Sequence, residues 1–375
     1  MILARRFKLD PTQEQEDVLF KTLEQYKDAL NAVLEYGFKS KISSGNALHN
    51  ATYYPLRRQT VLPSQLVCSA RVKATEVLKS IRSKTKGKFN TKQPKSHKFP
   101  TIRFDRNSCT IADGFVKFTT IQGRIQIPFF KYKFADDIKW KNVQKSCELK
   151  YTSRQWYIIV FVDQPVPKPK PVNRVLGIDR GCKHIAVCSN NQFFDSKRFR
   201  NGKGRYSYLK KRLQSKGTKS AKRLLKKISG KEHRFQKDVN HCISKQIVSQ
   251  PFDTFVFDKL NIKRSKKQGK RFNSTLNGWS YFQLEQFVKY KAELTGKRIE
   301  YVDARYTSQK CSCCGHTERS NRKSQSLFYC KSCNFQINAD LNASRNIKNN
   351  FNASLAISST SRAHSIVQTT QLLVS

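Results

Sequence analysis

Two Cys-x-x-Cys pairs late in the chain have the residue type and the spacing of a metal site. The first pair is Cys311 and Cys314, and the second is Cys330 and Cys333. Each pair forms a tight turn that aims two thiolates at one point, and four thiolates make a closed tetrahedral zinc site of the structural kind. The pairs are separated by the length of a zinc ribbon, which favours one structural Zn²⁺ over ordinary buried or disulfide-bonded cysteines.

Cys313 lies inside the first pair and could compete as a zinc ligand. We prefer Cys311, because the Cys-x-x-Cys spacing directs both sulfur atoms to one metal, whereas closer pairings fit that geometry poorly. The cysteines outside this region show no pairing pattern, which suits a reducing cytoplasm better than secretion.

Three aspartates stand where their carboxylates could share metal ions. Asp179 and Asp258 each end an apolar segment that reads as a buried strand, and Asp340 opens a late segment that reads as a helix. Carboxylates that converge at one edge of a sheet repel one another unless cations lie between them. Mg²⁺ prefers a few carboxylates together with water and phosphate oxygens.

Two Mg²⁺ ions about 3.5–4 Å apart can activate a water and stabilise the leaving oxygen of a phosphodiester. The order strand-acid, strand-acid, helix-acid is the one that an RNase H-like nuclease core needs. The alternative is three separate local roles, because strand-end acids are often turn residues and Asp340 could cap its own helix. The pattern as a whole favours the nuclease interpretation.

The charge of the chain indicates a polyanionic partner. Its 375 residues contain 73 Lys and Arg against 26 Asp and Glu, a formal net charge of +47. A protein this basic repels itself unless a polyanion neutralises it, and nucleic acid is the obvious one. A membrane surface is the alternative, but no apolar run approaches a transmembrane helix and the first residues form no signal peptide. We therefore expect a cytoplasmic, nucleoid-associated protein without a membrane partner.

Two basic segments, residues 79–103 and 197–237, hold the candidate nucleic-acid contacts. The first has aromatic residues interleaved with its cations, and the second has an apolar and a positive side at helical spacing. Either could be a solvated loop or helical hairpin, but the aromatic residues and the overall charge favour nucleic acid. The candidate contacts are Lys84, Lys86, Lys88, Lys92, Lys210, Lys211, Arg212, Arg223 and Arg234.

The elements that would position these residues can be predicted along the chain. Residues 2–8 read as a strand, and a helix follows with Asp10 as its N-cap and Gln13 as the capping-box partner. A Gly/Asn/Ser loop is expected at residues 43–50, before a second helix over about residues 64–83.

The second half of the chain alternates strands and helices after a linker. Residues 101–163 alternate or run apolar between polar turns, which predicts β structure. The proline-rich segment 165–171 is a stiff, extended linker and marks a domain boundary. Residues 280–294 read as a helix and 298–302 as a strand, whereas the Ser/Thr/Gln-rich tail from Asn352 is expected to be disordered.

Four segments of the chain carry a family resemblance: GIDRG, TFVFDKLNI, SYFQLEQFVKYKAELTGKRIEYVDARYTSQKCSCCG and NADLNASRNI. They resemble the TnpB family, transposon-encoded RNA-guided DNA endonucleases that are similar to compact type V CRISPR nucleases. The opening ARRFKLDPTQEQ and the segment QWYIIVFV also fit, so the resemblance spans nearly the whole chain. It is most specific over residues 175–347.

The resemblance implies a multidomain α+β fold. A β-rich, barrel-like wedge domain with a helical recognition insert would precede an RNase H-like (RuvC) α/β nuclease domain that a zinc ribbon interrupts. The expected boundaries are 1–10 and 96–165 for the wedge, 11–95 for the helical insert, 166–171 for the Pro-rich linker, 172–305 and 336–351 for the nuclease domain, 306–335 for the ribbon, and 352–375 for a disordered tail.

The resemblance also implies an activity, the Mg²⁺-dependent hydrolysis of DNA to 5′-phosphate and 3′-hydroxyl ends. The family's catalytic acids correspond to Asp179, Asp258 and Asp340, which would hold the magnesium, expected to be two ions. The partners would be a guide RNA from the transposon end and a double-stranded DNA target, of which the protein itself reads a short flanking motif. A protein oligomer is not required.

One position departs from the family pattern, and two alternative functions remain. The family usually has glutamate where this chain has Asp258, which keeps the charge but is one methylene shorter. The first alternative is therefore an RNA-guided DNA-binding protein that cuts weakly or not at all and acts as a repressor. The second is a transposase that joins DNA strands directly, although no motif places a catalytic Tyr or Ser.

Overall fold

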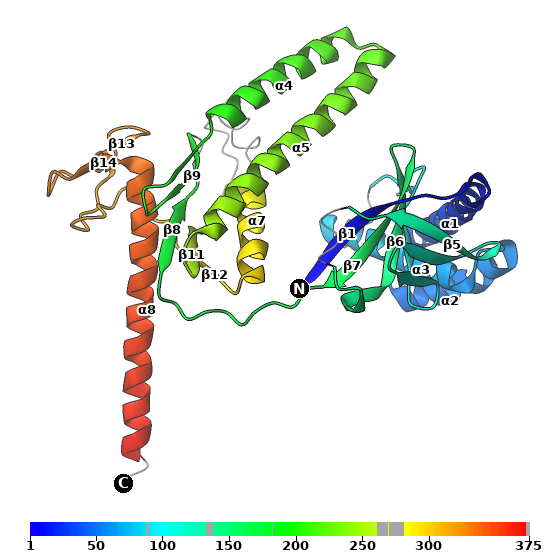
Figure 1. Cartoon of the computed structure of the whole chain (residues 1–375), viewed down its shortest axis with the longest axis horizontal. Helices are drawn as coiled ribbons and strands as arrows, with labels where there is room; N and C mark the ends of the chain where they lie inside the picture. The colour runs from blue at the N-terminus through cyan, green and yellow to red at the C-terminus, as the bar shows by residue number, and fades with distance from the viewer. Residues whose placement is uncertain are drawn as a thin grey trace. The chain divides into compact units, whose positions relative to one another are not determined.

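The chain folds into two compact units, residues 1–165 and 166–375 (Figure 1). The computed structural model describes residues 1–87, 89, 91–132, 138–181, 183–260, 269 and 281–372. Within these ranges, no helix combines the length and the apolar character that crossing a lipid bilayer requires.

An antiparallel sheet forms the framework of the first unit, where the sequence predicted β structure. Its strands are β1 (Ile2–Leu9), β2 (Ile102–Phe104), β3 (Cys109–Ala112), β4 (Phe115–Thr120), β5 (Gly123–Phe130), β6 (Val143–Thr152) and β7 (Gln155–Asp163), and a 3₁₀ turn (Trp140–Asn142) precedes β6. They lie in the order β2-β6-β7-β1-β5-β4-β3. The end strand β3 returns to β6, where Cys109 Sγ donates to the main-chain O of Lys145 at 3.9 Å, so the sheet is barrel-like.

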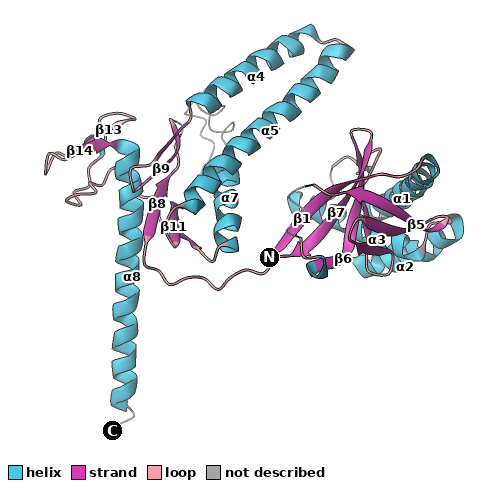
Figure 2. Cartoon of the chain, viewed as in Figure 1, coloured by secondary structure: helices cyan, strands magenta, loops and turns pink. Residues whose placement is uncertain are grey.

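Three helices pack on this sheet: α1 (Gln13–Lys39), α2 (Gly45–Gln59) and α3 (Ser64–Lys84) (Figure 2). Tyr26 of α1 and Leu66 of α3 are fully buried in the same hydrophobic cluster as Phe104 and Ile158 of the sheet. Because one core serves both layers, the helical segment and the sheet stabilise each other rather than folding as separate modules.

Two local predictions in this unit were wrong. The N-cap of α1 is Thr12 rather than Asp10: Thr12 Oγ1 accepts the Gln15 N–H at 3.3 Å, and Gln15 Oε1 accepts the Thr12 N–H at 3.1 Å. This is a capping box, placed two residues later than expected. Residues 45–50, expected in a loop, begin α2, which contains Pro55 and whose N-cap, Ser44, makes no side-chain capping bond within the described part of the chain.

A mixed sheet forms the centre of the second unit. Its strands are β8 (Val175–Asp179), β9 (His184–Cys188), β10 (Phe193–Asp195), β11 (Thr254–Asp258) and β12 (Arg298–Val302). They lie in the order β10-β9-β8-β11-β12; β8, β11 and β12 are parallel, and β9 and β10 run antiparallel to their neighbours. The carboxyl ends of β8 and β11 therefore meet at one edge of the sheet.

Helices cover both faces of this sheet, as the alternation of buried side chains in β11 requires. Phe255 and Phe257 pack in one cluster with Ile247 and Leu284, whereas Val256 packs in another cluster with Ile347. The helices are α4 (Lys197–Lys216), α5 (Lys219–Ser249), α7 (Tyr281–Leu294) and α8 (Ala339–Leu372). Figure 1 shows α4 and α5 as a long antiparallel hairpin.

Helix α8 lies directly against β8. A Cβ atom on Gly177 would lie 2.2 Å from the main-chain O of Ser344 and 2.7 Å from the N of Lys348, so only glycine allows this approach. The helix continues to Leu372, which differs from the disordered tail expected from Asn352.

Between β12 and α8 the chain forms a small ribbon. It contains a 3₁₀ turn (Arg319–Asn321) and a two-stranded sheet of β13 (Leu327–Tyr329) and β14 (Gln336–Asn338). Phe328 is buried beside Cys311, Cys330 and Ala339 in a core of its own.

Candidate functional site

The fold brings the three aspartates to one edge of the mixed sheet. Asp179 and Asp258 end the neighbouring parallel strands β8 and β11, and Asp340 lies in the first turn of α8. Asp340 also lies beside the turn after β8, because a Cβ on Gly181 would be 3.8 Å from its Oδ2. Asp258 and Asp340 are 4% and 3% exposed.

The proximity of these carboxylates changes their acidity. Burial, followed by repulsion from Asp258 and Asp340, raises the pKa of Asp179 to about 8, although Arg322 and Arg180 act in the opposite direction. Burial also raises the pKa of Asp258, despite the guanidinium of Arg180 beside it. A cluster of carboxylate oxygens matches the preference of Mg²⁺ for oxygen ligands, and a bound cation would favour the ionised form of each acid.

Asp340 does not cap its own helix. The side chain of Asn338 does so instead, since its Oδ1 accepts the N–H of Asp340 at 3.0 Å and that of Leu341 at 3.3 Å. The Asp340 carboxylate turns to the sheet edge, where His184 Nδ1 lies 3.0 Å from Oδ2 and Arg322 Nη2 lies 3.5 Å from Oδ1. The capping role that the sequence left open for Asp340 therefore belongs to its neighbour.

Three basic residues at this edge, Arg180, His184 and Arg322, were not predicted from the sequence. Arg180 directly follows Asp179, and its Nη2 donates to the main-chain O of Asp258 at 2.7 Å and lies 3.3 Å from Oδ1 of that residue. The only signal in the sequence was that Arg180 and His184 flank the glycine turn of GIDRG, because their partners are distant along the chain.

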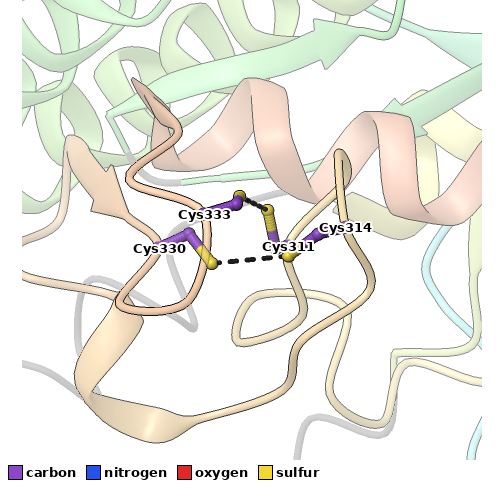
Figure 3. A group of neighbouring side chains, drawn as sticks. All are labelled: Cys311, Cys314, Cys330 and Cys333. Carbon is purple, nitrogen blue, oxygen red and sulfur yellow. Dashed lines mark hydrogen bonds between the residues drawn. The ribbon is translucent and has the colours of Figure 1, made fainter.

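The four predicted zinc ligands lie together (Figure 3). Their sulfur atoms all lie within 4.8 Å of one another, with 3.8 Å between Cys311 and Cys333 and 3.6 Å between Cys314 and Cys330. A tetrahedral zinc with bonds of about 2.3 Å separates its sulfur ligands by roughly 3.8 Å, so these cysteines fit the metal.

The cysteine cluster and the aspartate cluster differ in how closely their potential metal ligands approach one another. Within the described ranges, the cysteines are the only group of three or more potential ligands whose donor atoms all lie within 4.8 Å. Cys313 is exposed and is not in this group. The carboxylates of Asp258 and Asp340 are instead engaged by the basic side chains beside them.

Buried asparagines fasten the ribbon to α8. Asn342 Nδ2 donates to the main-chain O of Lys310 at 2.8 Å, and its Oδ1 accepts the Ser312 N–H at 2.9 Å. Asn346 Nδ2 donates to the main-chain O of Thr307 at 2.8 Å. The helix that carries Asp340 therefore also fixes the first Cys-x-x-Cys turn.

The candidate nucleic-acid residues are mostly exposed. Lys210, in α4, forms an ion pair with Glu232 of α5 and is the exception. Arg212 lies over the ring of Tyr208, 5.8 Å from its centre, where a base could stack beside a cation. The exposed candidates are Lys84, Lys86, Lys92, Lys211, Arg212, Arg223 and Arg234, and Lys88 lies outside the described residues.

Two family models match this chain. A model described as "Probable transposase" (OrfB_IS605) matches residues 157–268, and a model of the Cas12f1-like TNB domain matches residues 281–347. Together they cover most of the second unit, including all three aspartates and the four cysteines of the ribbon.

Individual proteins agree with these matches. The CRISPR-associated endodeoxyribonuclease Cas12f1 of Sulfoacidibacillus thermotolerans is 28% identical over 52% of this chain and 50% of its own length. A TnpB-like protein of Methanocaldococcus jannaschii is 28% identical over 66% of this chain and 91% of its own length. The chain thus spans half of the first relative and nearly all of the second.

The fold has a counterpart among solved structures. The cryo-EM structure of a Cas12f1-sgRNA-target DNA complex superposes with a TM-score of 0.61 and 18% identity, over 90% of this chain and 83% of that chain. At this identity the superposition establishes a shared fold: a barrel-like sheet with helices, a mixed sheet, and a ribbon that carries the cysteines.

Proposed function

Because the chain belongs to the TnpB family and carries a Cas12f1-like TNB domain, we propose that it is an RNA-guided DNA endonuclease of a transposon. The observation that supports this most is the meeting of Asp179, Asp258 and Asp340 at one sheet edge, with Asp340 released from capping by Asn338. The order of the strands and the position of α8 favour an RNase H-like (RuvC) site.

Asp179, Asp258 and Asp340 would hold the magnesium, for which two ions are expected. Mg²⁺ bound there would activate a water and stabilise the leaving oxygen of the phosphodiester. The side chains around the acids keep them in place: His184 and Arg322 contact the carboxylate of Asp340, and Arg180 contacts that of Asp258.

The four cysteines would hold one structural Zn²⁺ that folds the ribbon. Figure 3 shows how the two turns direct their sulfur atoms toward one point. The ribbon would then be a rigid support beside the acids, because Asn342 ties its first turn to α8.

The partners would be a guide RNA from the transposon end and a double-stranded DNA with a short flanking motif. The exposed cations of α4 and α5, together with Lys84, Lys86 and Lys92, would neutralise the phosphates of these nucleic acids. Base pairing would select the target, so the protein needs to read only the shape of the heteroduplex and the flanking motif.

The test is cleavage of guide-matched DNA in Mg²⁺ by the native chain and by two variants. Asp179→Ala and Asp340→Ala should each lose cleavage and keep guide-RNA and DNA binding, because the basic surfaces lie elsewhere. Asp303→Ala is the matched control, because Asp303 directly follows β12 but its side chain is 70% exposed and faces Arg305.

A native chain that binds its target but cuts in neither Mg²⁺ nor Mn²⁺ would refute the endonuclease. Guide-dependent binding without cutting would instead support the RNA-guided repressor. This alternative is considered because the side chain of Asp258 is shorter than the glutamate usual in the family.

A further inference from the structure

Arg180 is a buried arginine beside the candidate active site. Its side chain is only 2% exposed. Arginine is almost never fully buried unless it is paired, because removing a charge from water is costly. Its Nε–H is buried and donates to no partner among the described residues, so one donor of the guanidinium is left unsatisfied there.

The guanidinium is held from two sides. On one side, Nη2 donates to the main-chain O of Asp258 at 2.7 Å and lies 3.3 Å from Asp258 Oδ1. On the other side, Nη1 forms an ion pair with Oε2 of Glu285, from α7. Tyr301, from β12, donates its hydroxyl to the other oxygen, Glu285 Oε1, at 2.7 Å. The guanidinium lies over the ring of Phe257, with 5.0 Å between Arg180 Cζ and the ring centre.

Stability alone explains this network poorly. A buried ion pair is often no more stabilising than apolar side chains of the same volume, and an Nε–H that finds no partner among the residues described adds a cost. What the network does achieve is orientation, because Tyr301 and Glu285 fix the guanidinium and the guanidinium fixes the end of β11. The last residue of that strand is Asp258.

A direct role toward the nucleic acid does not fit the geometry. A phosphate would need an accessible guanidinium, and this one is enclosed and already directed at Asp258 and Glu285. Its effect on a phosphodiester would therefore have to pass through Asp258.

We propose that Arg180, anchored by Glu285 and Tyr301, is a positioning residue that holds the short side chain of Asp258 as a ligand for a divalent cation. Aspartate reaches one methylene less far than glutamate, so its carboxylate must be held more tightly to meet the ion. This inference rests on the proposed function, because it assumes that the three aspartates bind the catalytic metal.

The experiment removes both charges of the anchoring pair together. Arg180→Met with Glu285→Gln removes one positive and one negative charge, so the net charge of the buried network is unchanged and the second unit should still fold. Mn²⁺ affinity of the full chain, with zinc retained, is measured by electron paramagnetic resonance, and Asp179→Ala identifies the signal of this site. Cleavage rate and thermal unfolding are measured in parallel.

We expect the double variant to bind Mn²⁺ roughly 10–100-fold more weakly than the native chain, as for other residues that orient metal ligands. Adding Asp258→Glu should raise the Mn²⁺ affinity of the double variant but not that of the native chain. Only the double variant, which lacks the anchoring pair, needs the longer side chain to bring the carboxylate to the ion. If Arg180 only stabilised the fold, the effect of Asp258→Glu on Mn²⁺ affinity would not depend on whether Arg180 and Glu285 are present. Lys131→Met with Asp113→Asn, which removes an exposed ion pair of the first unit at 2.6 Å, is the matched control.

The proposal is overturned if the double variant binds Mn²⁺ like the native chain, or if Asp258→Glu has the same effect in both backgrounds. Should the double variant not fold, Tyr301→Phe provides the same test with a smaller change, and unaltered Mn²⁺ affinity in it also overturns the proposal. A native chain that binds Mn²⁺ at these acids but does not cut refutes the proposed function alone, since the affinity measurements do not depend on cutting.

Discussion

Arg322, from the loop between the two Cys-x-x-Cys turns, has its Nη2 3.5 Å from Oδ1 of Asp340. The ribbon thus contributes a cation to a carboxylate of the candidate active site. It is connected to the same helix a second time, through the hydrogen bonds of Asn342 to Lys310 and Ser312. A change in the fold of the ribbon should therefore alter the position of the Asp340 carboxylate.

Replacing one zinc ligand should disturb both the ribbon and the surroundings of Asp340. Cys314→Ser should reduce the zinc content from one ion per chain to none, unfold the ribbon and lower the cleavage rate, because ribbons of this kind need their metal to fold. Metal analysis and cleavage assays measure the two effects. The control is Cys313→Ser, which alters an exposed cysteine outside the cluster and should keep zinc. Full zinc in the Cys314→Ser protein would contradict the assignment.

Adding one methyl group at Gly177 should loosen α8. Its Cβ would lie 2.2 Å from the main-chain O of Ser344, so the helix must move, and we expect Gly177→Ala to cost about 1–3 kcal/mol of unfolding free energy. Urea unfolding measures this cost. Gly204→Ala, in α4, is the matched control, because no atom of the described residues lies within 4 Å of its Cβ, and it should stabilise by about 0.5–1 kcal/mol. Equal effects of the two changes would refute the close contact.

Without added Mg²⁺, the chain should lose stability as the pH rises. The pKa of Asp179 is raised from 3.8 to about 8, so between these values the folded chain binds more protons than the unfolded chain. Stability is therefore greatest below pH 4 for this group and falls until about pH 8, by about 1.4 kcal/mol for each unit of pKa difference. The raised pKa of Asp258 acts in the same direction.

Urea unfolding at pH 5 to 8, with zinc retained, measures this dependence. Asp179→Asn should flatten it, because the amide carries no charge at any of these pH values. Mg²⁺ should reduce the loss at pH 8 in the native chain. A slope that Asp179→Asn leaves unchanged would show that the carboxylate cluster does not set the dependence.

Guide-RNA binding should weaken steeply with salt, because each neutralised phosphate releases counterions. Replacing Lys211, Arg212 and Arg223 by Gln should lower the slope of log affinity against log salt by roughly 2–3, about one per lost phosphate contact. Filter binding between 50 and 300 mM salt, about the range over which such contacts matter, measures the slope. Lys39→Gln is the control, because Lys39 pairs with Glu35 at 2.6 Å in the first unit. An unchanged slope would exclude the α4–α5 hairpin as a contact surface.

The strands of the mixed sheet could be predicted because their signals are local. Val175–Asp179 and Thr254–Asp258 are short apolar runs that end in an acid, and parallel neighbours bring such ends together. The two Cys-x-x-Cys turns are equally local, and the structure brings their four sulfur atoms within 4.8 Å of one another.

What could not be predicted depends on partners far along the chain. Arg180 reads as one more surface cation until Glu285 and Tyr301 are seen to enclose it. Helix α2 was missed because Pro55 and a Gly-Asn start are signals of a loop, and packing overrides them. Asn342 and Asn346 have the spacing of one helical turn, which suggests a shared face but not the ribbon carbonyls that they bind.

The hydrogen bonds of Asn342 and Asn346 have a consequence for how this protein could diversify. They bring Thr307 and Lys310, where the ribbon begins, onto the first turns of the helix where the ribbon ends. Insertions whose two ends meet are tolerated best, because the host needs no rearrangement to accept them. We therefore expect a chimera that keeps residues 307–312 and α8 to fold with a different small domain grafted between them, as its thermal unfolding would reveal. The connection between β12 and α8 is then an insertion site at which evolution can replace one accessory domain by another without moving Asp340.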